Sequence, residues 1–257
     1  IHSLEKFNLL EITDLRGSQS QESELESRLL SNQQHVFDLE NSQAFRFELV
    51  LLSNNEAHLV INIHHIIWDG WSLALLLREL QNTFNGEERV DFNEHAHYLH
   101  FSQWQEKEFS GDNLPDGAKR ALNYWQEKLH DAPPYINLPL DSDRPDLQGF
   151  EGGHVQVELG EERLAQLSKV ASQLSTTPFY VLLTSFYLLL HKYSRQDDIC
   201  LAVPVSGRSH QAFENTIGFF VNVLVLRQDF SANLNFSELL KLIQEQSLES
   251  IDFQDLP

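Results

Sequence analysis

The sequence predicts a mixed fold of the α/β or α+β class, built as two lobes. Strand-like and helix-like segments intermix in both halves of the chain. With 41% hydrophobic and 22% charged residues, the composition is that of an ordinary globular protein. Residues 131–153 are rich in Pro, Gly and Asp and lack a helical period. We therefore expect an N-terminal lobe over 1–133, a linker over 134–152 and a C-terminal lobe over 153–257.

The first half begins its regular structure with a predicted β-hairpin. Residues 44–52 alternate, with phenylalanines and leucines on one face and Arg46 and Glu48 on the other. Residues 57–65 are also strand-like, and the "SNNE" between the two segments is typical of a turn. A helix capped by Ser72 and ended by Gly86 should follow, with helices over 93–108 and 117–130 after it. The predicted apolar face of the helix between Ser72 and Gly86 consists of Leu73, Leu76, Leu77, Leu80 and Phe84.

The second half should open with a short strand, "HVQVEL", at 154–159. Leucines and an alanine at helical spacing mark an amphipathic helix over 164–174. Thr177 and Pro178 should cap and begin a largely buried helix that runs to about Tyr193. "DICLAVPVSGR" and "IGFFVNVLVLR" are typical of strands, and 236–252 of a last helix.

Charge and cysteine content limit the partners and the compartment. A net charge of −20 disfavours nucleic acid and anionic membranes, which attract basic surfaces. The single cysteine, Cys200, excludes an internal disulfide and favours a reducing compartment, so we expect a cytoplasmic protein. Cys200 itself sits in an apolar strand and is expected to be inert core. Because the sequence starts at Ile1 and contains no methionine, we expect a piece of a longer polypeptide.

The stretch "INIHHIIWDGWS" places two histidines at the end of an apolar run. On an extended strand, neighbouring side chains point to opposite faces. His65 should therefore share a face with Ile61 and Ile63, and His64 should share the other face with Asn62. This split argues against a metal pair made by the two histidines alone, since they would need convergent rings and a third ligand.

Asp69 and Gly70, which follow the histidines, indicate a loop of defined conformation. Asp69 could fix the bend by accepting backbone N–H groups, or it could pair with a distant arginine. Gly70 would let the backbone take a positive φ. A neutral histidine at the mouth of a cleft can act as a general base near pH 7. The alternative is a half-buried strand end in which His64 and His65 hydrogen bond to the backbone.

A second histidine group, "EHAHYLH", contains His95, His97 and His100 and invites a zinc interpretation. On a helix, His97 and His100 are neighbours while His95 lies off their face. We favour a solvated helix face and expect no metal site.

Several segments, taken together, resemble condensation domains of nonribosomal peptide synthetases. "INIHHIIWDGWSLALLLREL" is similar to that family's HHxxxDG motif and the helix after it. "YLHFSQW", "NYWQEKLHDAPPYINLPLDSDRP", "TTPFYVLLTSFYLLLHKYSRQDDICLAVPVSGR", "IGFFVNVLVLR" and "FQDLP" resemble further family segments in the same order. Departures occur at His100, Val223 and Phe253, where Asp, Thr, and His or Asn are usual. The family's first and last motifs are absent, so we expect both lobes to be incomplete.

The resemblance implies a chloramphenicol-acetyltransferase-like fold of two lobes, each with a mostly antiparallel or mixed sheet and helices. It implies amide formation, in which an acceptor amine attacks a donor thioester. Donor and acceptor carrier proteins would bring both substrates on phosphopantetheine arms, next to neighbouring synthetase domains, and no cofactor would be bound directly. By the same resemblance, we expect a monomeric domain that acts in antibiotic or other secondary-metabolite synthesis.

The same resemblance assigns roles to residues. His65 would be the catalytic histidine, with His64, Asp69 and Gly70 completing the motif and maintaining its loop. Asp69 would pair across the lobes with a basic residue, for which Arg208 is the candidate. We expect the substrate channel to be lined by Trp68, Trp71, Ser206 and Asn222.

Other functions compete with peptide-bond formation. Heterocyclisation domains carry Asp in place of His64, and epimerisation domains differ from "IGFFVN", so both are disfavoured. A non-catalytic module of the same fold could recruit a carrier protein or an accessory enzyme. A stand-alone acyltransferase could use the same histidine loop on free alcohols or amines.

Overall fold

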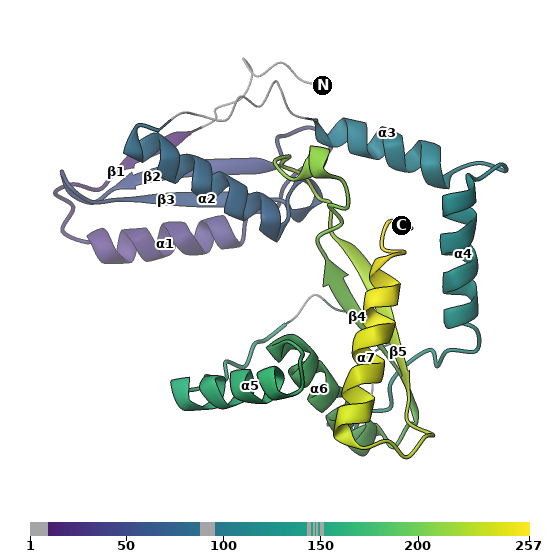
Figure 1. Cartoon of the computed structure of the whole chain (residues 1–257). Coiled ribbons are helices and arrows are strands. Elements are labelled where there is room, and N and C mark those ends of the chain that lie inside the picture. Colours follow the sequence, from purple (N-terminus) through teal and green to yellow (C-terminus); the bar gives the residue numbers. More distant parts are fainter. Residues whose placement is uncertain (1–9, 88–95, 143–144, 146, 148, 150–151) are drawn as a thin grey trace. The chain divides into compact units, whose positions relative to one another are not determined.

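The structure is a computed structural model that describes residues 10–87, 96–142, 145, 147, 149 and 152–257 (Figure 1). Contacts group the chain into two units, one of Ile1–Trp104 with Arg208–Val221 and one of Gln105–Gly207 with Asn222–Pro257. A short piece of the second half of the chain therefore belongs to the first unit. These contact units are not the predicted lobes, and the lobe boundaries at 133/134 and 152/153 stay a prediction.

The first unit contains a three-stranded mixed sheet. Its strands are β1 (Glu11–Asp14), β2 (Phe45–Leu51) and β3 (Ala57–Ile63), in the order β1-β2-β3. β1 is parallel to β2, and β2 and β3 form the predicted antiparallel hairpin, in which Leu51 lies opposite Ala57. The helical elements placed around it are α1 (Gln21–Gln33), the 3-10 turn η2 (His65–Ile67), α2 (Gly70–Asn85) and the start of α3 (Tyr98–Phe109).

The polar side of strand β2 is its buried side. Glu48 and Val50 are buried, whereas Phe45 and Phe47 on the opposite face are half-buried. Helix α1 lies along this sheet (Figure 1) and makes the burial of a carboxylate possible. Burial would raise the pKa of Glu48, but hydrogen bonds from Thr13 and Asn32 and the Arg28 charge hold it below its ordinary value.

The second unit pairs β4 (Asp198–Val205) with β5 (Asn222–Asp229) in an antiparallel ladder. Helices α5 (Glu161–Gln173), α6 (Pro178–Ser194) and α7 (Phe236–Ile251) form the predicted helical part, and α4 (Asp116–Lys128) precedes them. Tyr187 is almost completely buried among apolar residues of α6, β4, β5 and α7, and its hydroxyl donates to the Leu226 carbonyl at 2.7 Å. Pro178 begins α6, as predicted, and a capping box of Asn235 and Glu238 begins α7.

Three predictions of local structure need correction. Residues 154–159 form no strand, and Val155 is 90% exposed, because a strand needs a hydrogen-bonded neighbour and none of the described strands pairs with it. Helix α2 buries Ser72 and Leu75 instead of the leucine face predicted for it. The strand predicted over 57–65 ends at Ile63. Of the helix predicted over 93–108, the part before 96 lies outside the described residues.

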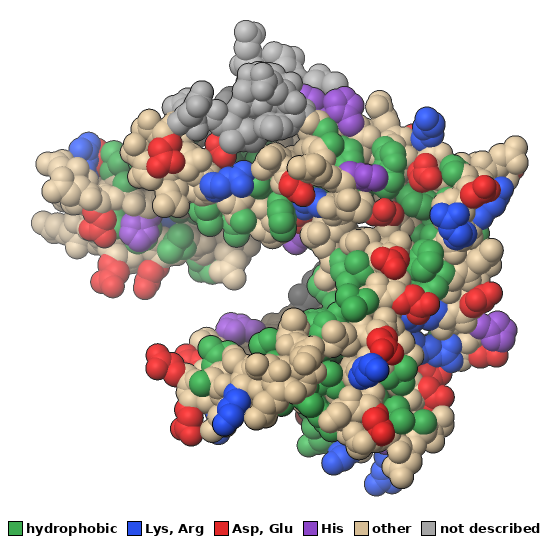
Figure 2. Space-filling view, in the orientation of Figure 1, with side chains coloured by type: hydrophobic (Ala, Val, Ile, Leu, Met, Phe, Trp, Pro, Cys, Tyr) green, Lys and Arg blue, Asp and Glu red, His purple; other side chains and the backbone are tan. Residues whose placement is uncertain are grey.

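Acidic side chains are spread over the visible face of both units in Figure 2 and do not gather in one patch. This distribution fits a net charge of −20 that is carried by the surface in general. In the part of the chain that the structure covers, no helix is long and apolar enough to cross a membrane.

Candidate active site

The histidine pair lies where strand β3 gives way to a tight turn. His64 is still extended, at φ −70° and ψ 133°, and His65 begins the 3-10 turn η2. The alternation of a strand therefore does not reach His65, and the prediction that it shares a face with Ile61 and Ile63 is wrong. His64 precedes the turn and His65 is its first residue, so the two side chains leave backbone of different conformation.

His64 serves the backbone of this turn. Its Nδ1 accepts a hydrogen bond from the Ile66 N–H at 3.0 Å. The ring also meets Phe37 edge to face, with 6.0 Å between centroids. Hydrogen bonding to the backbone, the alternative considered for both histidines, thus applies to His64.

His65 is arranged differently. Its side chain is exposed, and its imidazole meets the ring of Phe219 edge to face, with centroids 5.3 Å apart and planes at 85°. Among the residues that the structure describes, none hydrogen bonds to this imidazole. Both ring nitrogens of His65 are therefore available to a substrate.

Asp69 begins helix α2. Its Oδ1 accepts from the backbone N–H and the hydroxyl of Ser72, both at 2.8 Å. Asp69 is therefore the N-cap, and Ser72, predicted to cap this helix, is its third residue. The Ser72 hydroxyl in turn lies 3.0 Å from the Gly218 carbonyl oxygen and 3.1 Å from the Gly218 backbone nitrogen. The start of α2 is thereby joined to the chain around residue 218.

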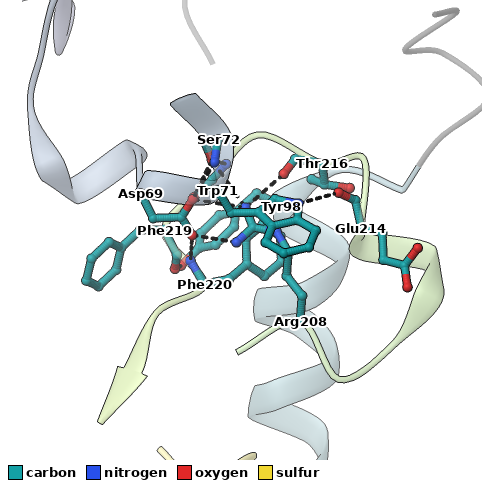
Figure 3. A network of polar contacts seen from close by, with 10 residues as sticks. Asp69, Trp71, Ser72, Tyr98, Arg208, Glu214, Thr216, Phe219 and Phe220 are labelled. Carbon is teal, nitrogen blue, oxygen red and sulfur yellow. Dashed lines mark hydrogen bonds and ion pairs between the residues drawn. The ribbon is translucent and has the colours of Figure 1, made fainter. Parts of the chain in front are cut away.

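The ion pair predicted between Asp69 and Arg208 is present, and Figure 3 shows its setting. The Arg208 Nη1 donates to Asp69 Oδ2 at 2.6 Å and Nη2 donates to Asp69 Oδ1 at 3.1 Å. The two side chains are 2% and 0% exposed. The guanidinium lies 4.2 Å from the ring centroid of Phe220 and 5.8 Å from that of Trp71, within cation–π range. Both partners belong to the first unit.

The carboxylate of Asp69 is fully engaged. Three hydrogen bonds reach its Oδ1, and two, from Arg208 and the Phe220 N–H, reach its Oδ2. Burial would raise the pKa of Asp69, but the hydrogen bonds from Arg208, Ser72 and Phe220 outweigh burial and lower it. A carboxylate held ionised and saturated by donors is not free to orient His65 or to take up a proton.

Gly70 does not take the conformation predicted for it. It is the first residue of α2, and its φ is not positive. A β-carbon added at Gly70 would meet no atom within 4 Å, so neither its backbone nor packing demands glycine here.

The residues predicted to line a channel are divided between the units. Trp71 lies in the first unit, where its indole N–H donates to the Glu214 carbonyl at 2.8 Å, and Trp68 ends the turn η2 as a half-buried residue. Ser206 and Asn222 belong to the second unit. The Asn222 amide there donates to the carbonyls of Gln254 and Leu256, at 2.7 Å each.

Sequence reasoning missed several residues that build this site. The Tyr98 hydroxyl donates to the Phe219 carbonyl at 2.8 Å, and burial together with the nearby Asp69 charge raises the pKa of Tyr98. A β-carbon at Gly218 would overlap the Tyr98 ring, so only glycine fits there. Both residues stand in segments already notable in sequence, "YLHFSQW" and "IGFFVN". The resemblance of those segments to a family was the available signal, but it did not reveal their contact.

The described members of the second histidine group form no metal site, and the cysteine is no activated nucleophile. The His100 Nδ1 accepts from the His97 N–H at 3.1 Å, and His95 lies outside the described residues. No cluster of three or more metal-ligating side chains occurs in the part of the chain that is described. Burial raises the pKa of Cys200, so its thiol is not activated.

Comparison with known proteins shows the family of this chain. The condensation domain profile matches residues 1–257. The chain belongs to the condensation domain family. The domain is 33% identical over 240 residues to gramicidin S synthase 2 of Aneurinibacillus migulanus, and the match covers 93% of this chain and 5% of that protein. It is 34% identical over 221 residues to tyrocidine synthase 3 of Brevibacillus parabrevis, with 86% of this chain and 3% of that protein covered. The domain thus spans only a few per cent of the length of these curated relatives.

Solved structures show the same chloramphenicol-acetyltransferase-like α/β fold, as predicted. The domain is 26% identical to the four-domain nonribosomal peptide synthetase holo-AB3403 bound to AMP and glycine, with a TM-score of 0.80 over 96% of this chain and 18% of that one. It also resembles the X-domain in complex with OxyB from teicoplanin biosynthesis, with 22% identity and a TM-score of 0.78 over 96% of this chain and 55% of that one. The second likeness concerns fold alone.

Proposed function

We propose that this chain carries the catalytic histidine loop of a domain that forms peptide bonds in nonribosomal peptide synthesis. One observation supports the proposal most strongly. His65 has an exposed imidazole with both nitrogens available, while His64 and Asp69 of the same loop are engaged in holding that loop. The acceptor would be an α-amine and the donor a thioester, each on the phosphopantetheine arm of a carrier protein.

The chemistry needs little from the protein. The amine nitrogen attacks the thioester carbonyl, the C–N bond forms, and the C–S bond breaks to release a thiol. The proton lost by the amine passes to the departing sulfur, and His65 can take it up on the way or hold the amine by a hydrogen bond. Because the nucleophile arrives with the substrate, no acyl-enzyme is required, and positioning of the two arms supplies most of the catalysis.

The other residues of the motif would act through the backbone. His64 stabilises the turn, and Asp69, paired with Arg208, fixes the start of α2 beside it. We propose Trp68, Trp71, Ser206 and Asn222 as lining of the substrate channel. Trp68 would narrow that channel beside His65, and an unchanged substrate range in Trp68→Ser would refute this role.

The decisive experiment uses the full-length synthetase with a loaded donor and acceptor carrier. Product is measured by mass for wild type, for His65→Ala and for His58→Ala, a matched control at an exposed histidine of β3 in the same unit. We expect product from wild type and from His58→Ala, and a loss of at least a hundredfold in His65→Ala, the usual size of a general-base contribution of about 10²–10⁴. Equal product from His65→Ala and wild type would rule out the catalytic assignment.

A second candidate function is a binding module that recruits a carrier protein or an accessory enzyme. The likeness to the X-domain supports this second candidate, because that domain has the same fold and was solved in complex with a protein partner, OxyB. Intact carrier binding with no product from wild type would support this function. In either case we propose neighbouring synthetase domains and carrier proteins as partners, with the domain monomeric in the cytoplasm and without a cofactor of its own.

A further inference from the structure

The feature that leads beyond the proposed function is the contact between His65 and Phe219. A catalytic histidine commonly has an orienting partner, such as a carboxylate or a backbone carbonyl bonded to its second nitrogen. Here Asp69, the carboxylate of the same motif, is saturated by other donors. The ring of Phe219 is the described side chain that meets the imidazole.

Phe219 is well placed for such a task because its backbone is fixed on both sides. Its own carbonyl accepts from Tyr98, and the next N–H, that of Phe220, donates to Asp69. On the other side, Gly218 hydrogen bonds to Ser72 and packs so tightly against Tyr98 that no β-carbon fits. The side chain of Phe219 therefore leaves a rigid segment.

His65 leaves an equally rigid segment. The turn η2 is closed by the bond from the Ile66 N–H to the ring of His64 and by the backbone bond from Trp68 to His65 at 3.3 Å. Two fixed backbones thus hold two rings at 5.3 Å and 85°, the edge-to-face arrangement that aromatic rings prefer. An exposed histidine without this contact would sample three staggered χ1 wells and two orientations about χ2.

We propose that Phe219 is a positioning residue that holds the imidazole of His65 in one rotamer for the reaction. The inference rests on the proposed function. Phe219 touches no reacting atom in this role, so its loss should lower the fraction of His65 in the productive orientation. It should leave the binding of the carrier-bound substrates unchanged.

The test compares two variants in the full-length synthetase with loaded carriers. Phe219→Leu removes the ring but keeps an apolar side chain, and Phe219→Tyr keeps the ring. We expect kcat to fall about three- to sixfold in Phe219→Leu, from the number of rotamers released. We expect an unchanged KM for the acceptor carrier and a kcat within about twofold of wild type for Phe219→Tyr. A matched control, Phe186→Leu on the half-exposed face of α6, should equal wild type.

Three results would overturn the inference: a kcat of Phe219→Leu equal to wild type, a loss in Phe219→Tyr as large as in Phe219→Leu, or a raised KM with unchanged kcat. Unfolding midpoints of the variants, measured alongside, separate a folding defect from a loss of orientation. If wild type forms product, His65→Ala does not and Phe219→Leu equals wild type, only this inference fails. If wild type forms none, or His65→Ala forms as much, the proposed function itself fails.

Discussion

Replacing Asp69 by Asn should cost a large part of the domain's stability. Asn caps a helix about as well as Asp, so the change keeps the start of α2. It removes the charge and turns one of the two acceptor oxygens into an NH2 donor. It leaves the Arg208 guanidinium buried without its counter-ion, and removing one partner of a buried ion pair costs about 3–5 kcal/mol. Taking about 4 kcal/mol, the folding equilibrium shifts roughly a thousandfold, and a chain of 257 residues that unfolds as a whole loses roughly 8–16 °C in its unfolding midpoint.

The assay is urea and thermal unfolding of the full-length domain, with two comparison variants. In Asp69→Asn with Arg208→Met, no unpaired guanidinium remains, so the double variant should be more stable than Asp69→Asn alone. Asp14→Asn breaks an exposed pair with Arg16 and should leave the midpoint unchanged. A loss below about 1 kcal/mol in Asp69→Asn, the size seen for exposed pairs, would refute the claim that Asp69 is the counter-ion that the buried Arg208 requires.

Three further outcomes follow from packing and from shifted pKa values. Gly218→Ala should lower the unfolding midpoint by several degrees, because its β-carbon overlaps the Tyr98 ring, and a midpoint equal to wild type in a thermal scan would contradict that packing. The pKa values of Asp69 and Glu48 lie below their ordinary values, so their contribution to stability is complete above about pH 4 and is lost as the pH falls further. Urea unfolding at several pH values should therefore show a decline below about pH 4 that is shallower in Asp69→Asn. Burial raises the pKa of Cys200, so the native thiol should react with iodoacetamide more slowly at neutral pH than the same thiol in urea.

Elements whose signals are local could be predicted from the sequence. The β2–β3 hairpin follows from two alternating segments and a polar turn, and α6 from a proline at its first position. Gly86 ends α2 in a left-handed conformation, at φ 71°, as its position after the last helical residue suggests. Each of these signals lies within a few residues of the structure that it specifies.

Elements that depend on distant partners could not be predicted in the same way. Strand β1 has four residues and pairs in parallel with β2, so it has neither the length nor a neighbouring turn to reveal it. The burial of Glu48 shows the same difficulty, since alternation alone places it on a polar face. Only α1, which brings Arg28 and Asn32 over that face, turns it into an interior position.

The site combines both kinds of information. The motif marked His65 and Asp69, but the partner of Asp69 lies 139 residues away, and Arg208 could be named only through resemblance to a family. The structure adds a consequence that the motif does not contain. Asp69 caps α2 directly after the turn that carries His65, and it accepts the N–H of Phe220, the residue next to Phe219.

One carboxylate therefore bonds to the backbone close to both rings of the His65–Phe219 contact, and this bears on how variants of Asp69 are interpreted. If Asp69→Asn abolishes product, the loss can arise from two displaced backbones without any proton passing through Asp69. Phe219→Leu leaves the Asp69 network intact and disturbs only the ring contact. A small fall of kcat in Phe219→Leu would therefore assign the orientation of His65 to the Phe219 ring. A large loss of both stability and activity in Asp69→Asn would assign a structural role to the carboxylate. Equal stability of both variants, with activity lost only in Asp69→Asn, would instead require a direct chemical role for Asp69, which its five donors argue against.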